Sequence, residues 1–143
     1  MAEQPQQQQP VSSTRRYKLA ATATNIRAGV AWDFFKGSAK VDLDMSAMIF
    51  DELSYEHDVA FYNKLSACDG AVQHSGDNRD GQASGDDESI SINLSQLNES
   101  VRSLFFLVNV HDDKPNVTFK NVETGRFTLY VNDQPCYTYH LSL

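Results

Sequence analysis

The sequence predicts an all-β fold, an antiparallel β-sandwich with one short helical turn. Two patterns lead to this prediction: apolar residues recur at every second position in several short runs, and a single segment has helical spacing. At 143 residues the chain is long enough for one domain and too short for two independent cores. Apolar residues make up 41% and include no run of about 18 residues, so we expect no membrane span.

The N-terminal residues 1–16 are expected to form a disordered tail. The first ten contain five Gln and two Pro and offer no apolar face that could be buried. Residues 17–143 then make up the domain. The start of the chain lacks the basic and apolar pattern of a secretory signal, so we expect a cytoplasmic location, in which Cys68 and Cys136 remain thiols.

The clearest predicted strand begins at Val41 and runs to Phe50. Alternate apolar residues point to one face, and Asp42 and Asp44 therefore share the opposite face. Similar runs predict further strands over residues 59–65, 89–94, 104–110, 127–131 and 137–143. We expect the aromatic residues of these regions to lie in the core: Trp32, Phe34, Phe61, Tyr62, Phe105 and Phe106.

Two connections have recognisable turn or helix signals. Residues 95–102 have helical spacing, with Ser95 as the predicted N-cap and Leu97 and Val101 on one face. The sequence Asn-Asp-Gln-Pro at positions 132–135 predicts a hairpin between the last two strands.

Negative charge is concentrated in one loop. The whole chain has a net charge of -7, and residues 69–88 contribute -5 of it, from six carboxylates and one arginine. Carboxylates crowded in this way repel one another unless water and salt screen them or a cation binds among them. The charge pattern alone is compatible with either a solvated acidic loop or a metal site.

The same loop has the donor composition of a calcium site. Calcium prefers six to eight oxygen ligands, and residues 76–88 supply carboxylates and an amide at short intervals with three glycines that permit tight turns. The EF-hand pattern does not fit, because placing Gly81 at the sixth position of that loop puts Gly76 at the first position and Asp87 at the twelfth. Asp112 and Asp113, which follow a predicted strand, are additional candidates.

At these residues the sequence resembles the tellurium-resistance TerD family of calcium-binding β-sandwich proteins. The matching segments are Ala31-Trp32-Asp33, Val41 to Ala47, Phe61-Tyr62-Asn63, His74 to Asn78 and Gly85 to Glu88. The resemblance implies an acidic calcium-binding loop, as a rule with two ions, and no established catalytic reaction. It also implies a role in resistance to tellurite, phage and toxins or in general stress, and some eukaryotic relatives are described as binding cyclic AMP.

Donor chemistry and the resemblance together give the candidate metal ligands. They are Asp42, Asp44, Asp77, Asn78, Asp80, Asp86, Asp87, Glu88 and Asp112. The sequence departs from the family at Gln82 and Ser84, where acidic residues are usual, which weakens the case for a second ion. The chain also ends short of the expected last strands, so we expect an open sheet edge at the C-terminal strand and a homodimer or protein partner there.

The sequence therefore predicts a non-enzymatic calcium-binding domain that acts in stress or toxicant response as a calcium-ordered interaction module. One alternative is a calcium-dependent membrane-binding module of the C2 type, although Arg79 alone offers a basic loop residue to anionic lipid. Another is a cyclic-nucleotide-binding protein, although the chain has no Gly-rich phosphate cradle. The acidic balance weighs against nucleic acid as a partner, and the four scattered histidines indicate no catalytic triad.

Overall fold

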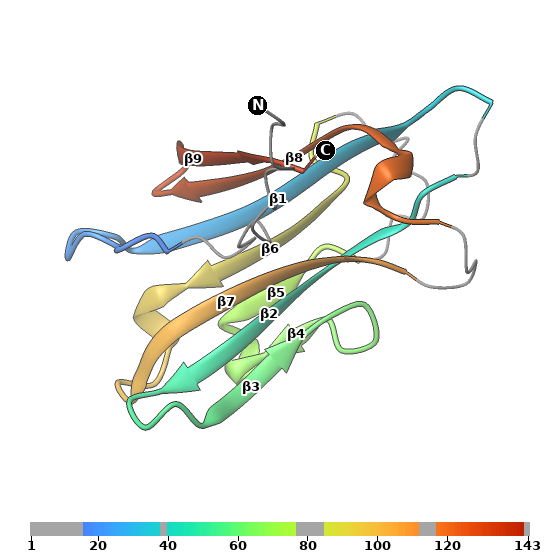
Figure 1. The fold of residues 1–143 in the computed structure, drawn as a ribbon. Coiled ribbons are helices and arrows are strands. Elements are labelled where there is room, and N and C mark those ends of the chain that lie inside the picture. The colour runs from blue at the N-terminus through green and yellow to red at the C-terminus, as the bar shows by residue number, and fades with distance from the viewer. Residues whose placement is uncertain (1–15, 38–39, 77–84, 112–116, 142–143) are drawn as a thin grey trace, which may run out of the picture.

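The computed structural model describes residues 16–37, 40–76, 85–111 and 117–141, and these residues form two antiparallel sheets packed face to face (Figure 1). The strands are β1 (Asn25–Phe34), β2 (Leu43–Asp51), β3 (Glu56–Ala60), β4 (Ser66–Ala67), β5 (Val72–His74), β6 (Glu88–Asn93), β7 (Val101–Val110), β8 (Val122–Val131) and β9 (Gln134–His140). Three short 3-10 turns accompany them: η1 (Cys68–Gly70), η2 (Leu94–Gln96) and η3 (Phe119–Asn121). The predicted β-sandwich is confirmed.

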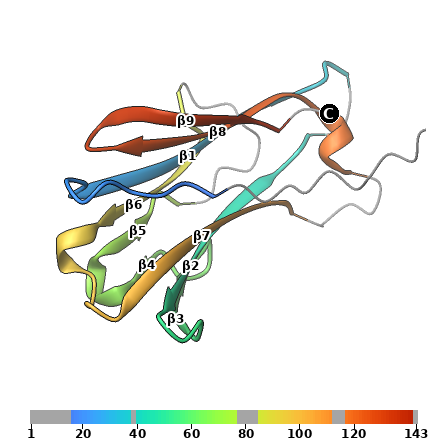
Figure 2. The same cartoon turned by 60° about the vertical axis from the view of Figure 1, so that its left-hand side comes forward.

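The two sheets differ in size. The large sheet has six strands in the order β4-β5-β6-β1-β8-β9, and the small sheet has three in the order β3-β2-β7. The central strands are β1, which pairs with β6 and β8, and β2, which pairs with β3 and β7. Figure 2 shows the layers from the side, with β9 beyond β7 at one end of the large sheet. As expected, the C-terminal strand stands at a sheet edge.

The core lies between the sheets and is formed by alternate residues of the central strands. From β1 it receives Ile26, Ala28, Val30 and Trp32, and from β2 it receives Leu43, Met45, Ala47 and Ile49, all of which are buried. This period of two is what a strand with one buried face requires. The described part of the chain contains no helix with the length and apolar character needed for a membrane crossing.

Most predicted strands are present, with shifted limits. The strand predicted over residues 59–65 is wrong in extent, because β3 ends at Ala60 and a tight turn joins Phe61 to Lys64 through two backbone hydrogen bonds. The Lys64 ammonium folds back onto Asp58, which favours this turn over a continued strand. The sequence patterns did not predict β1, β4 or β5.

The predicted helix over residues 95–102 is wrong. Asn93, and not Ser95, caps the short turn η2, since its side chain accepts a hydrogen bond from the Ser95 N–H. The backbone is extended at Leu97, and β7 begins at Val101. Leu97 in the loop and Val101 at the start of β7 each pack against the core, which accounts for their spacing.

The predicted hairpin at residues 132–135 is confirmed, with a shorter turn. Asn132 and Asp133 have φ values of 49° and 65°, the left-handed conformation of a two-residue hairpin turn, and β9 begins directly afterwards. Two of the predicted core aromatics are wrong: Tyr62 and Phe105 are 44% and 46% exposed. Phe105 lies on the small sheet and Tyr62 in the turn after β3.

Candidate metal site

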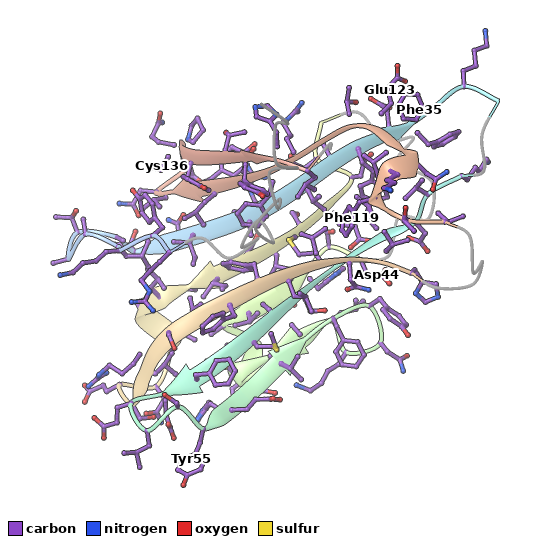
Figure 3. The ribbon with its side chains drawn as sticks, viewed as in Figure 1. Phe35, Asp44, Tyr55, Phe119, Glu123 and Cys136 are labelled. Atoms are coloured by element: carbon purple, nitrogen blue, oxygen red, sulfur yellow. The ribbon has the colours of Figure 1, made fainter. Side chains whose placement is uncertain are left out.

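Three potential metal ligands come together at one end of the small sheet. Oxygen or nitrogen atoms of Asp42, Asp44 and His111 all lie within 4.8 Å of one another. Nδ1 of His111 lies 2.8 Å from Oδ2 of Asp44. We refer to these three residues as the Asp-His group. Figure 3 labels Asp44, which lies where the start of β2 meets the end of β7.

Strand register explains why these residues meet. The pairing of Leu43 with Val110 places Asp42 opposite His111, and the His111 N–H donates to the Asp42 carbonyl at 2.8 Å. Because side chains alternate along a strand, Asp42 and Asp44 share the face opposite Leu43. The shared face predicted for the two aspartates is confirmed, and it is the outer face of the small sheet.

One member of the Asp-His group is buried, and the other two are partly exposed. Asp44 is 4% exposed, and the Oδ1 atoms of both Asp42 and Asp44 are buried. The ring of Tyr62 stands edge-on to His111, with 5.6 Å between the ring centroids, and covers one side of the group. Two carboxylates this close, one of them buried, are unfavourable as anions unless a positive charge accompanies them. A protonated His111 or a bound cation provides such a charge.

His111 was not among the residues predicted to hold a metal. The signal that could have identified it is positional, because it follows directly on the predicted strand that ends at Val110 and precedes Asp112. The sequence alone did not show that this strand pairs with the one carrying Asp42 and Asp44. The pairing is a long-range contact, and it is what brings the histidine to the carboxylates.

Asp86, at the end of the acidic loop, lies on the outer face of the large sheet. Its Oδ2 accepts a hydrogen bond from the guanidinium of Arg27 at 2.9 Å, and Arg27 in turn lies over the ring of Tyr130. Gly29 permits this arrangement, because a Cβ at that position would overlap the carboxylate of Asp86. The next residue, Asp87, is 9% exposed and accepts a hydrogen bond from the backbone N–H of Trp32 at 2.8 Å.

Glu88 lies between the two sheets. It is 1% exposed, and its Oε2 accepts a hydrogen bond from the N–H of Met45 at 3.2 Å. The His74 Nε2 lies 3.1 Å from the Met45 carbonyl. Since Nδ1 of His74 accepts from the Gly76 N–H at 2.9 Å, the ring proton is on Nε2, which donates to that carbonyl. Two side chains of the large sheet thus satisfy the backbone of Met45.

The need for these two side chains follows from the length of β3. Along β2, Met45 turns its N–H and C=O away from β7, because the hydrogen-bonded pairs of an antiparallel ladder alternate. The strand β3 pairs with β2 only from Ala47 onward and does not reach Met45. Glu88 and His74 therefore occupy the place of a missing strand.

The structure divides the predicted ligands into three sets. Asp42 and Asp44 belong to the Asp-His group, whereas Asp86, Asp87 and Glu88 lie outside it. The remaining predicted ligands, Asp77, Asn78, Asp80 and Asp112, lie outside the described residues. Gly76 and Gly85 adjoin the segment 77–84, and their φ values of 104° and 77° explain why glycine stands at both positions.

Comparison with known proteins relates the chain to one family. The family model of the TerD domain matches residues 10–142. The tellurium resistance protein TerD of Serratia marcescens is 35% identical over 120 residues, which are 81% of this chain and 62% of that protein. General stress protein 16U of Bacillus subtilis is 31% identical over 134 residues, 87% of this chain and 69% of that protein.

Solved structures have the same fold. A homologue of telluride resistance protein (TerD) from Streptomyces coelicolor A3(2) superposes with a TM-score of 0.71 at 21% identity, over 82% of this chain and 71% of that chain. This chain spans less than two thirds of the length of the Serratia relative. The sequence matches and the sandwich agree, and the chain belongs to the TerD domain family.

Proposed function

We propose that the chain is a non-enzymatic calcium-binding domain that acts in stress response as a calcium-ordered interaction module. The observation that carries the proposal is the Asp-His group, in which two carboxylates and an imidazole converge around the buried Asp44. Calcium accepts carboxylate, carbonyl and water oxygens in flexible geometry, so a pair of aspartates at the end of a strand suits it. The ion would supply the positive charge that these carboxylates favour.

The anchoring of the acidic loop supports this site. Before the segment 77–84, His74 contacts the carbonyl of Met45, the residue next to Asp44. After the segment, Asp87 holds the backbone of Trp32, whose indole N–H donates to the Val41 carbonyl at 2.8 Å. Both ends of the loop are therefore tied to the start of β2, where the Asp-His group lies. The loop sequence contains Asp77, Asn78 and Asp80, which are oxygen donors of the required kind.

In this site His111 acts as a positioning residue. Its Nδ1 lies 2.8 Å from Asp44, so a neutral imidazole that donates from this nitrogen orients the carboxylate. Calcium prefers oxygen to nitrogen ligands. The aspartates would therefore bind the ion, and the histidine would hold Asp44 in position.

The stress-response role rests on the relatives. The Serratia protein is named for tellurium resistance, and the Bacillus protein is named as a general stress protein. We propose that this chain serves the same kind of response, with calcium ordering a surface that binds another molecule. If calcium binds the folded chain and not the unfolded chain, it stabilises the folded state by mass action.

Thermal unfolding with calcium and with a chelator tests the proposal. We expect calcium to raise the midpoint, since a ligand at 100 times its Kd adds about 2.7 kcal/mol to the free energy of unfolding. The double variant Asp42→Asn, Asp44→Asn should lose this increase. Asp33→Asn is the matched control, because Asp33 is an exposed aspartate on the other sheet that bonds only Thr124 among the contacts described. Equal midpoints with calcium and with chelator for the unaltered chain would overturn the proposal.

The aspartates at the end of the loop are poor choices for this test. Asp86→Asn weakens the contact with Arg27, and Asp87→Asn weakens the acceptor for the Trp32 N–H. Both changes alter stability without any ion, so their effect on a melting curve cannot be assigned to calcium. Asp42 and Asp44 are the better choice because they form the Asp-His group itself, and the calcium-dependent difference is measured within each variant.

A further inference from the structure

The imidazole distinguishes the Asp-His group from a site made of oxygen ligands alone. Calcium takes oxygen ligands, whereas zinc accepts an imidazole nitrogen together with carboxylate oxygens. Nδ1 of His111 lies 2.8 Å from Oδ2 of Asp44, and ligand atoms of all three residues lie within 4.8 Å of one another. Two ligands of one zinc ion are about 3–3.5 Å apart, since each lies about 2.0–2.2 Å from the metal. The nitrogen and the oxygen are therefore already close to the spacing that zinc requires.

A second histidine of the chain shows an arrangement that has no place for an ion. His74 lies 3.5 Å from Glu88, and both side chains are fully buried. Both ring nitrogens of His74 are occupied by hydrogen bonds with the backbone. The side chain of His111 is 30% exposed, which leaves its ring accessible from solvent. Among the described residues, no other three His, Cys, Asp or Glu side chains converge as those of the Asp-His group do.

The ligand atoms of the Asp-His group are held in place by the backbone and by packing. The His111 N–H donates to the Asp42 carbonyl at 2.8 Å, which fixes the two strand ends relative to each other. Asp44 is 4% exposed, and the ring of Tyr62 stands edge-on to the imidazole with 5.6 Å between the centroids. Tyr62 is itself packed edge-on to Phe61, also at 5.6 Å. Donors that are held in this way lose little conformational freedom when they bind an ion.

We propose that the Asp-His group also binds zinc, with Nδ1 of His111 as a direct ligand beside the carboxylates of Asp42 and Asp44. The proposal rests on the proposed function in taking this group as a metal site, and it adds a second class of ion. His111 positions Asp44 when calcium is bound and supplies a nitrogen ligand when zinc is bound. With zinc at Nδ1, the neutral ring carries its proton on Nε2.

Competition between the two ions follows from the shared carboxylates. Zinc and calcium both need Asp42 and Asp44, so one ion excludes the other. Zinc gains the imidazole as an additional ligand, which calcium does not favour. Zinc therefore displaces calcium from this site, and excess calcium weakens the apparent binding of zinc.

The experiment adds zinc to the complete chain after bound ions have been stripped. NMR of the imidazole nitrogens identifies the ligand directly, because the resonance of a ring nitrogen changes when it binds a metal. We expect a saturable change at Nδ1 of His111. No such change is expected at His57, His74 or His140. Calorimetry of the same chain with zinc and with calcium gives the two affinities.

The variant His111→Gln separates ligation from positioning. Glutamine retains an N–H that can donate to Asp44, but it lacks the imidazole nitrogen. We expect the zinc affinity to fall at least about tenfold, because a direct ligand is lost. The calcium affinity should stay nearly unchanged, since the hydrogen bond to the carboxylate is kept. His140→Gln is the matched control, because His140 is an exposed histidine on β9 of the large sheet, and it should change neither affinity.

Three results overturn the proposal. They are no saturable binding up to millimolar zinc, a metal-bound resonance at another histidine in place of His111, and equal zinc affinity in His111→Gln. If this variant does not fold, the spectrum of the unaltered chain decides, since it reports on His111 directly. The two metal proposals can fail separately: zinc binding without calcium binding supports this proposal and overturns the proposed function, and calcium binding without zinc binding does the reverse.

Discussion

The strands β1 and β7 are each ten residues long and have opposite environments. In β1 six of ten residues are buried, whereas in β7 none is. The sequence of β7, VRSLFFLVNV, is nevertheless the more apolar of the two, since that of β1 is NIRAGVAWDF. The difference comes from neighbours: β1 pairs on both sides and lies under the small sheet, and β7 pairs on one side at the end of its sheet. Apolar content predicts the need for burial, and pairing decides whether it is met.

The largest expected effect is at Trp32, near the end of β1. Trp32 is 2% exposed and fixes the start of β2 through its indole N–H. Trp32→Ala should lower the free energy of unfolding by about 3–5 kcal/mol, the usual cost of removing a buried aromatic ring. Trp32→Phe keeps most of the packing and should cost clearly less. Urea unfolding measures both, and a loss below about 1 kcal/mol for Trp32→Ala would contradict the assigned burial.

An intermediate effect is expected at the other edge of the small sheet. Asp58 of β3 accepts the Cys68 N–H at 2.7 Å and the Lys64 ammonium at 2.6 Å, which together lower the pKa of its carboxyl from 3.8 to about 2. The edge at β3 is thus tied to the residues that follow it, through Lys64 and Cys68. Asp58→Asn should cost about 1–2 kcal/mol at neutral pH.

The stability of the Asp58→Asn variant as a function of pH tests whether the ionised carboxylate of Asp58 holds the β3 edge. Because the pKa of Asp58 is lower in the folded chain, its contribution is fully present above about pH 4 and is lost as the pH falls through about 2. The stability difference between the unaltered chain and Asp58→Asn should therefore shrink over this interval. If the difference in the free energy of unfolding stays constant from pH 6 to about 2, the ionised carboxylate of Asp58 is not what stabilises the unaltered chain relative to the variant.

The smallest effect is expected on the outer face of β7. Leu107 is 49% exposed, so Leu107→Ala should change the free energy of unfolding by less than about 0.5 kcal/mol. The same substitution reduces the exposed apolar surface and should raise solubility. Equilibrium unfolding and a precipitation curve measure the two properties. If Leu107→Ala lowers the free energy of unfolding as much as removal of a buried leucine does, the outer face of β7 is covered in solution.

Local pattern was sufficient for several elements of the fold. The alternation in β2, β6 and β8 and the turn residues Asn132 and Asp133 each have a direct physical meaning within a few residues. The pattern failed for β1, because Gly29 and Ala31 on its outer face obscure the alternation. It also failed after β6, where Asn93 caps the short turn η2 and the backbone is already extended at Leu97, so the helix suggested by the spacing of Leu97 and Val101 does not form.

The candidate site was predictable in composition and not in geometry. Asp42 and Asp44 were identified by strand period, and their shared face needs no long-range information. His111 is 67 residues from Asp44 in the sequence, and only the pairing of β2 with β7 brings it to the site. Glu88 shows the reverse case, since it was predicted from loop composition and lies between the sheets beside His74.

The central claim is that the Asp-His group binds calcium, and titration of the chain with calcium tests it most directly. The chain is stripped of ions and titrated with calcium by calorimetry, in parallel with the Asp42→Asn, Asp44→Asn variant. We predict saturable binding by the unaltered chain and at least about a tenfold loss of affinity in the variant, equal to about 1.4 kcal/mol. Absence of binding up to millimolar calcium, or equal affinity in the variant, would contradict the claim.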